Sequence, residues 1–104
     1  MRARVTDDGG VELVGRLDVR GAAAAREALH EALARGPVRV PVDLSGVELL
    51  DATGLGVLVA AHRRARLQGC ELVLCDAGPR VARLLSLTRL DRVIAVERRG
   101  SVLA

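Results

Sequence analysis

The chain has 104 residues and a mass of 11.0 kDa, a size typical of a single domain. Half of its residues are hydrophobic, 28% are charged and none is aromatic, so leucine, valine and alanine must fill the core. No apolar stretch approaches the roughly 20 residues of a membrane-spanning helix, and the first residues lack the apolar block of a secretory signal. We therefore expect a cytoplasmic protein that does not insert into a membrane.

Two features that could indicate a bound ligand are weak here. The net charge is +3, but no aromatic side chain is present on which a base could stack, and no zinc-finger or basic-zipper spacing occurs. We therefore expect solvated arginines and no nucleic-acid partner. The two cysteines, Cys70 and Cys75, have no histidine nearby and are expected to be reduced. The sequence predicts neither a metal nor a cofactor.

The first predicted elements are a β-hairpin and a helix. Residues 2–6 and 11–14 are β-like runs joined by four turn-forming residues. Apolar residues then recur at helical spacing over residues 22–33, and Gly36 with the proline that follows ends this helix. Asp18 is a candidate cap for the helix, although Gly21 leaves its exact start open.

Strands and helices alternate in the rest of the chain. Residues 38–44 are rich in β-branched residues and predict a buried strand, in which Pro41 indicates a bulge or a locally unpaired position. The elements expected after it are a helix from near Thr53 to Gly69, a strand at 71–75, a helix opened by Gly78 and Pro79, a strand at 93–96, and a tail or short final helix at 98–104.

This alternation defines the expected fold class. Strands that alternate with helices indicate parallel strands joined by right-handed crossovers. With the hairpin added, we expect one α/β domain over residues 1–104, with a mixed, mostly parallel sheet of four to five strands packed with three to four helices. A fold class does not define a function, which must be argued from a site.

The segment most informative about function is 42–56. It predicts a buried strand, a short loop, and then a helix opened by the sequence Asp-Ala-Thr-Gly at 51–54. Thr53 is expected at or beside the helix N-cap, where its hydroxyl can accept a backbone N–H. Gly54 and Gly56 each cost a helix about 1 kcal/mol relative to alanine. Either tight packing on the sheet or the close approach of a protein surface must therefore favour them.

The first two turns of this helix are apolar nearly all round, from Leu55 to Ala61. Burial in a layered fold would explain that pattern without any function. An exposed remainder beside Thr53 would instead be a docking patch. The sequence leaves both explanations open.

These residues resemble the STAS domain (sulfate transporter and anti-sigma factor antagonist), and in particular the free-standing bacterial anti-sigma factor antagonists. The resemblance covers nearly the whole chain. It depends on the order and spacing of Gly-Arg-Leu-Asp at 15–18, Asp-Leu-Ser at 43–45, Asp-Ala-Thr-Gly-Leu-Gly at 51–56, Gly-Cys-Glu-Leu-Val-Leu at 69–74, and the run at 81–88 followed by 91–94. Two positions depart from the family pattern: Ala52 stands where serine is frequent, and Arg89 where glycine is frequent.

The resemblance implies a binding protein and not an enzyme. In such antagonists the anti-sigma factor, an ATP-using kinase, phosphorylates a serine or threonine of the loop, and a phosphatase reverses the reaction. The acceptor here would be Thr53. The unmodified antagonist binds the anti-sigma factor and releases its sigma factor, as in stress responses and sporulation, and it would be a monomer or a weak dimer. The residues expected to contact the partner are Asp18, Ser45, Asp51, Ala52, Thr53, Gly54, Leu55, Gly56 and Leu58.

Several alternatives stay open at this point. Thr53 could be an ordinary N-cap, and Ser45, the second hydroxyl of the region, suits a turn. The chain could also be a scaffold of a stress-signalling complex or the STAS regulatory subunit of an ABC-type lipid transporter. His30 and His62 lie on predicted polar helix faces, and no nucleophile–base pattern is present.

Overall fold

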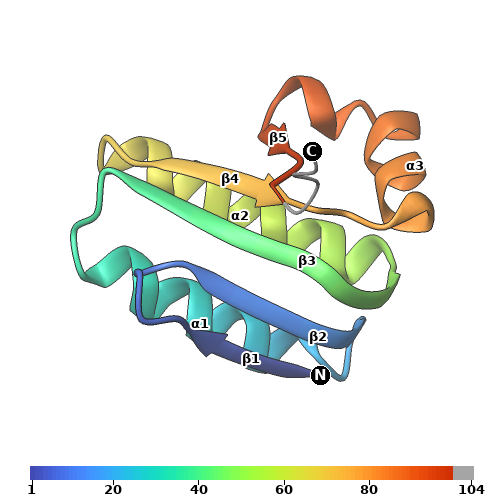
Figure 1. Cartoon of the computed structure of the whole chain (residues 1–104), viewed down its shortest axis with the longest axis horizontal. Helices are drawn as coiled ribbons and strands as arrows, with labels where there is room; N and C mark the ends of the chain where they lie inside the picture. Colours follow the sequence, from blue (N-terminus) through green and yellow to red (C-terminus); the bar gives the residue numbers. More distant parts are fainter. Residues whose placement is uncertain (100–104) are drawn as a thin grey trace.

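The computed structural model describes residues 1–99 and contains five strands and three α-helices (Figure 1). The elements in chain order are β1 (Arg2–Val5), β2 (Val11–Leu17), α1 (Ala22–Ala34), β3 (Arg39–Leu50), α2 (Ala52–Leu67), β4 (Glu71–Cys75), α3 (Pro79–Leu87), the 3₁₀ turn η1 (Leu90–Arg92) and β5 (Ala95–Glu97). The sheet has the order β1-β2-β3-β4-β5, with β1 antiparallel to β2 and the other neighbours parallel. The expected mixed, mostly parallel α/β fold is confirmed.

The strand order decides where the helices lie. Each crossover from β2 onward moves the chain by one strand in the same direction, and right-handed crossovers then put α1 and α2 on one face of the sheet. Figure 1 shows α1 and α2 behind the sheet in this way. The core fills the space between these layers, and its fully buried leucines are Leu13, Leu17, Leu44, Leu72 and Leu74 from strands with Leu29, Leu33, Leu58 and Leu85 from helices.

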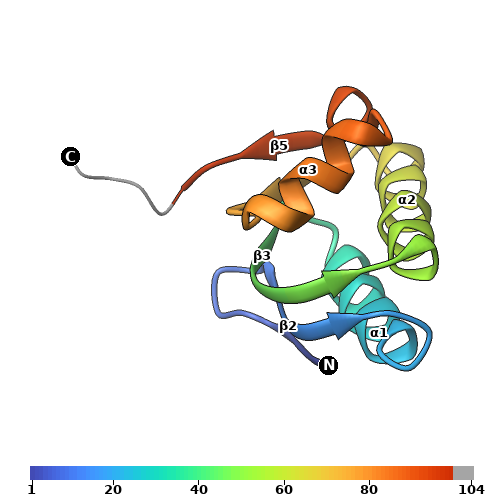
Figure 2. The same ribbon diagram turned by 90° about the vertical axis from the view of Figure 1, so that its right-hand side faces the viewer.

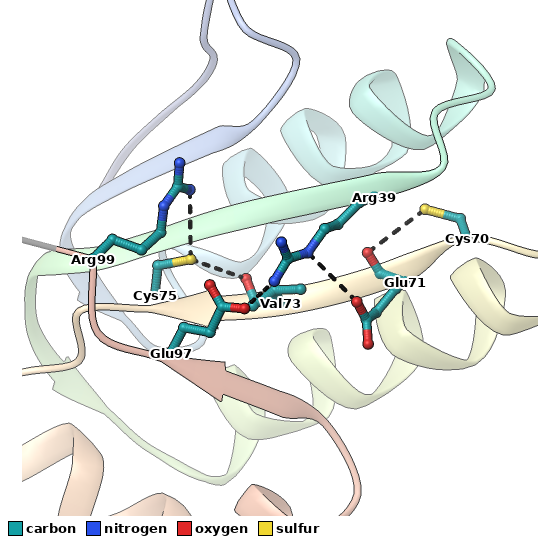
Figure 3. Close-up of polar contacts among 7 residues, drawn as sticks. All are labelled: Arg39, Cys70, Glu71, Val73, Cys75, Glu97 and Arg99. Carbon is teal, nitrogen blue, oxygen red and sulfur yellow. Dashed lines mark hydrogen bonds and ion pairs between the residues drawn. The ribbon is translucent and has the colours of Figure 1, made fainter.

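The opposite face of the sheet carries ion pairs between strands. Arg39 of β3 pairs with Glu71 of β4, at 3.4 Å between Nε and Oε1, and with Glu97 of β5 (Figure 3). Val73 lies among these side chains and is fully buried. All three charged side chains are at least 40% exposed, so each pair contributes less than about 1 kcal/mol. Arg39 thus adds a side-chain contact between β3 and the three-residue β5, whose backbone pairs with β4.

The cysteines are both free and buried. Burial raises the pKa of the Cys70 thiol, which keeps it protonated. The Cys75 sulfur lies 3.8 Å from a guanidinium nitrogen of Arg99 (Figure 3). Within residues 1–99 no cluster of histidine, cysteine and carboxylate side chains could hold a metal ion, and no helix is long and apolar enough to cross a membrane.

The third strand is longer than the sequence predicted. We expected it to end near residue 44, with Ser45 in a turn, but β3 continues to Leu50. Its second half pairs with β2, from Val14 opposite Gly46 to Leu17 opposite Leu50, and this pairing overrides the local turn preference. The predicted bulge at Pro41 is wrong with respect to β4, because the pairing of β3 with β4 runs through Pro41 without a shift. The alternative, a locally unpaired position, holds toward β2, because the pairing of β3 with β2 begins at Val42.

Two helix starts also differ from the prediction. Asp18 does not cap α1, whose N-cap is Gly21 without a side-chain bond. The Asp18 carboxylate instead accepts the backbone N–H groups of Arg20 and Gly21, at 3.0 and 3.2 Å, and so closes the turn that precedes the helix. The N-cap of α2 is Asp51 and not Thr53.

The end of the described chain contains one element that was not predicted. Arg89 adopts a left-handed backbone (φ 61°) and is followed by η1, so β5 begins at Ala95 and not at residue 93. The left-handed region favours glycine, and Arg89 occupies it with a side chain. The predicted tail or short helix is neither helix nor strand at residues 98–99, and residues 100–104 lie outside the described part.

Candidate functional site

The candidate site lies at the edge of the sheet where β2 and β3 end. Leu17 and Leu50, the last residues of these strands, are paired in register. Asp18 and Asp51 follow them directly, and the Asp51 N–H donates to the Leu17 carbonyl at 3.4 Å. The carboxyl ends of parallel strands are the usual place for binding sites in α/β folds. The topology therefore brings Asp18, Asp51 and the start of α2 together.

Asp51 holds the first turn of α2. Its backbone is extended (φ −114°, ψ −170°), and its carboxylate accepts the N–H of Gly54 at 2.9 Å. This bond satisfies one of the amides that a helix N-terminus leaves without an intrahelical partner. Thr53 is then the second helical residue, exposed, and its hydroxyl bonds to no other described residue. The interpretation of Thr53 as an ordinary N-cap is wrong, because Asp51 has that role.

The two glycines of α2 have different surroundings. A Cβ on Gly54 would lie 2.1 Å from the Leu17 carbonyl oxygen and 2.7 Å from a methyl carbon of Leu50, so only glycine allows α2 to pack here. A Cβ on Gly56 would meet nothing within 4 Å. Tight packing on the sheet therefore explains Gly54. It does not explain Gly56, which is exposed.

The remaining predicted contact residues divide into surface and core. Ala52 is exposed and Leu55 is half-buried, both beside Thr53. Leu58 is completely buried in the core and offers no surface to a partner. Ser45 is exposed but lies on β3 six residues before Asp51, about 20 Å away along an extended strand at about 3.3 Å per residue. The structure does not bring Ser45 to the site.

The apolar start of α2 is mostly core. Three of its residues, Val57, Leu58 and Ala61, are buried, while Leu55 and Val59 are half-buried. Burial against the sheet and α1 thus accounts for most of the apolar pattern that left two explanations open.

Two exposed apolar residues at this edge were not predicted. Val19, in the turn after β2, is 72% exposed, and Leu49, near the end of β3, is 40% exposed. The alternation of a strand would have predicted Leu49, because Leu50 beside it is buried and neighbouring side chains point to opposite faces. No comparable signal marks Val19, which lies in an irregular turn. Both residues add apolar surface beside the start of α2.

At Thr53 the dipole of α2 favours an anion, whereas the Asp51 carboxylate opposes one. The first turn of α2 contains no acidic residue. The acidic group that faces the positive end of the helix dipole is the N-cap, Asp51. His62 lies at the other end of α2, beside Arg66 and Cys70 in a cavity of about 250 Å³, and burial lowers its pKa. A larger cavity of about 580 Å³ is lined by Arg4, Asp8, Asp43, Cys75 and Arg99 among others, and none of its lining residues belongs to α2.

The cap predicts a difference between two substitutions of Asp51. Asparagine caps a helix about as well as aspartate, whereas alanine at a cap costs about 1 kcal/mol. Asp51→Asn is therefore expected to leave the free energy of unfolding within about 0.5 kcal/mol of wild type, and Asp51→Ala to lower it by about 1 kcal/mol. Urea denaturation followed by circular dichroism measures both. Equal losses in the two variants would contradict a capping role and indicate that the charge itself stabilises the fold.

Comparison with known proteins adds an independent line of observation. A family model described as "Mlab, STAS domain" matches residues 1–97. The chain is 32% identical over 97 residues to the anti-sigma-B factor antagonist of Listeria monocytogenes, covering 93% of this chain and 85% of that protein. It is 34% identical over 86 residues to the anti-sigma-B factor antagonist of Bacillus subtilis, covering 83% and 78%. A crystal structure of an anti-sigma factor antagonist from Mycobacterium paratuberculosis is similar with a TM-score of 0.81 and 30% identity, covering 91% and 83%.

Proposed function

The chain belongs to the STAS domain family, and from this membership we propose that it is an anti-sigma factor antagonist switched by phosphorylation of Thr53. In the unmodified state it binds an anti-sigma factor that is also a serine/threonine kinase, and this binding releases the sigma factor. Phosphorylation ends the binding, and a phosphatase restores it. The observation that carries the proposal is the exposed Thr53 hydroxyl on a helix turn that Asp51 already caps.

The position of Thr53 suits a phosphate acceptor. Its hydroxyl bonds to no other described group, so transfer of a phosphate breaks no structural hydrogen bond. The first turn of α2 carries no acidic side chain, and a phosphate of about −1.5 to −2 charges would be stabilised there by the exposed amides. We therefore expect the fold to tolerate the modification.

The complex with the anti-sigma factor would not tolerate phosphorylation of Thr53. Thr53 and Asp51 stand two residues apart at the surface that we assign to the partner. Desolvation of a phosphate and a carboxylate against a docked protein costs several kcal/mol unless a cation pairs with them. Since about 1.4 kcal/mol corresponds to a tenfold change in affinity, the loss is about a hundredfold or more.

The acceptor is tested by phosphorylation in vitro. The purified chain is incubated with ATP and the anti-sigma factor kinases of its host, each produced separately, and the products are measured by intact-mass and peptide mass spectrometry. Wild type is expected to gain one phosphate at Thr53, and Thr53→Ala none. Ser45→Ala serves as the control, because Ser45 is an exposed hydroxyl outside the site. Phosphate on Thr53→Ala, or its loss in Ser45→Ala, would contradict the assignment.

Gly56 gives a prediction about the contact surface. Alanine at this exposed helical position has free space and a better helix propensity, so Gly56→Ala is expected to stabilise the fold by up to about 1 kcal/mol. If the partner approaches the α2 backbone closely, the added methyl weakens the complex at the same time. Thermal unfolding and isothermal titration calorimetry measure the two effects. A variant that is more stable and binds as tightly as wild type would place Gly56 outside the contact.

A second candidate function is the STAS regulatory subunit of an ABC-type lipid transporter. The observation that favours it is the description of the matching family model, whose name "Mlab" differs from those of the antagonists. Such a subunit would dock on a transporter ATPase, and we expect that contact to be unaffected by Thr53→Glu. Affinity capture with wild type and Thr53→Glu as parallel baits therefore distinguishes the two functions.

A further inference from the structure

Residues 79–92, which form α3 and η1, are one of the positively charged stretches of the chain; Arg63, Arg64 and Arg66 of α2 form another. Residues 79–92 contain four arginines and one acidic residue, Asp91, which gives a net charge of +3. The whole chain also has a formal net charge of +3, because its other twelve arginines are matched by twelve acidic residues. The net charge of residues 79–92 thus equals that of the whole chain.

The arginines of this stretch make no salt bridges within residues 1–99. The salt bridges in that part of the chain involve Arg4, Arg35 and Arg39 instead. The four arginines of this stretch, Arg80, Arg83, Arg89 and Arg92, are all exposed. They share the lack of a salt bridge with most other arginines of residues 1–99. A surface on which every cation lacks an internal partner is available to an acidic partner from outside.

The outward side of α3 also carries an exposed apolar residue. Arg80, Arg83 and Leu87 follow each other at helical spacing and share one side of the helix, while Val81 and Leu85 point into the core. Leu87 is 70% exposed, and Val93, directly after η1, is 57% exposed. We use the name α3 face for Arg80, Arg83 and Leu87. An apolar residue beside cations is typical of a protein interface, in which charged side chains surround a smaller apolar contact.

The fold places α3 at the same edge of the sheet as the candidate site. β4 ends opposite Asp43, and β3 continues for seven residues beyond this pair, up to Leu50. α3 follows β4 at this same edge of the sheet and packs against β3. Figure 2 shows α3 and the beginning of α2 on the same side of the molecule. A protein docked on Thr53 would therefore have α3 as its neighbour.

The start of α2 is smaller than the area that a stable protein interface buries. A stable protein complex buries about 800 Å² on each partner, drawn from about 20–30 residues. The exposed residues at the start of α2 are small, namely Ala52, Thr53 and Gly56, and they supply little of this area. A partner that covers Thr53 must therefore extend onto adjacent surface, of which Val19 and Leu49 supply an apolar part. The α3 face is adjacent and combines positive charge with an apolar residue.

We propose that the α3 face is a second part of the anti-sigma factor interface, contacted by acidic side chains of the anti-sigma factor around an apolar residue that packs on Leu87. The inference rests on the proposed function and names the chemistry of its partner. Nucleic acid fits the surface less well, because residues 1–99 offer no aromatic side chain for stacking and the face includes the exposed apolar Leu87. An anionic membrane would be expected to favour longer amphipathic helices than the nine residues of α3.

The test compares two charge reversals of equal size. The test variant, Arg80→Glu/Arg83→Glu, changes the α3 face. The control variant, Arg2→Glu/Arg26→Glu, makes the same change of net charge on β1 and α1. Both control arginines are exposed and make no salt bridge with a described residue. Affinity for the purified anti-sigma factor is measured by calorimetry at low and at high salt, after circular dichroism confirms that each variant is folded. The α3 variant is expected to bind at least about tenfold more weakly at low salt, with a smaller salt dependence than wild type. The control variant is expected to bind within about twofold of wild type.

The outcomes separate this inference from the proposed function. If wild type binds the anti-sigma factor and the α3 variant binds equally well, or if both reversals weaken binding equally, the α3 contact is wrong and the proposed function stands. If wild type binds none of the host's anti-sigma factors, the proposed function fails, and this inference fails with it. Binding of duplex DNA or of phosphatidylserine vesicles by wild type, lost in the α3 variant alone, would assign the face to that other ligand and overturn the inference.

Discussion

Phosphorylation of Thr53 is expected to weaken binding of the anti-sigma factor by about a hundredfold or more, with no loss of folded structure. The physical reason is an asymmetry between fold and complex. Within the fold, the added anion lies at an exposed helix N-terminus that favours it. Within the complex, the anion and the nearby Asp51 carboxylate would have to lose their water. Calorimetric titration of the phosphorylated and unmodified chains against the same anti-sigma factor gives the ratio of dissociation constants.

Thr53→Glu should reproduce only part of this effect. Glutamate adds one negative charge where phosphothreonine adds about 1.5 to 2, so we expect a loss of affinity of about tenfold or more. Thr53→Val removes the hydroxyl with little change of volume and no change of charge, and it is the matched control. Equal affinity of the glutamate and valine variants would show that charge at this position does not control binding.

Gly54→Ala is expected to be the most destabilising single change at the site. The added Cβ would lie 2.1 Å from the Leu17 carbonyl oxygen, which belongs to a strand fixed by its pairing with β3. Overpacking against fixed backbone costs about 1–3 kcal/mol or more, and the gain in helix propensity of about 1 kcal/mol offsets only part of it. We therefore expect a net loss of about 1–2 kcal/mol in the free energy of unfolding, a substantial part of the 5–15 kcal/mol typical of a domain.

The comparison with Gly56→Ala makes this prediction specific. The same substitution two positions along the same helix is expected to stabilise the protein, because nothing lies within 4 Å of the new methyl group. Both variants replace glycine with alanine, so the substitution changes the entropy of the unfolded chain by a similar amount in each. Urea denaturation under identical conditions therefore compares their effects on the folded state. If Gly54→Ala proves as stable as wild type, α2 is able to move away from Leu17, and the close packing of its first turn is not required.

Local patterns in the sequence predicted the elements that local chemistry determines. The strand at 71–75 coincides with β4, and Pro79 opens α3 at its first position, as expected. Gly36 and Gly69, placed at helix ends by the sequence, have positive φ angles of 72° and 73°. Each of these features depends on the residues immediately around it, which is why a single sequence is sufficient to find it.

Features that depend on distant pairing were not predictable in the same way. β3 continues through Ser45 and Gly46 because β2 pairs with it there, and no local sequence pattern indicates that pairing. The choice of Asp51 over Thr53 as the cap is a matter of one or two residues, within the range over which helix starts are hard to predict.

The residues of the candidate site also divide into those positioned by local sequence and those positioned by distant packing. Thr53 and Asp51 are positioned by their own helix turn, so the sequence motif located them. Leu58 is buried because α2 packs its inner side on the core, and Ser45 is distant because β3 extends beyond the predicted end. The proximity of α3 to the site comes from the different lengths of β3 and β4, a property of the sheet as a whole.

The central claim is tested most directly by release of the sigma factor. The purified complex of anti-sigma factor and sigma factor is mixed with the unmodified chain or with the chain phosphorylated on Thr53, and free sigma factor is measured by size-exclusion chromatography. We predict that the unmodified chain releases the sigma factor and that the phosphorylated chain does not. A complex that stays intact with the unmodified chain, or that both forms disrupt equally, would contradict the proposed switch.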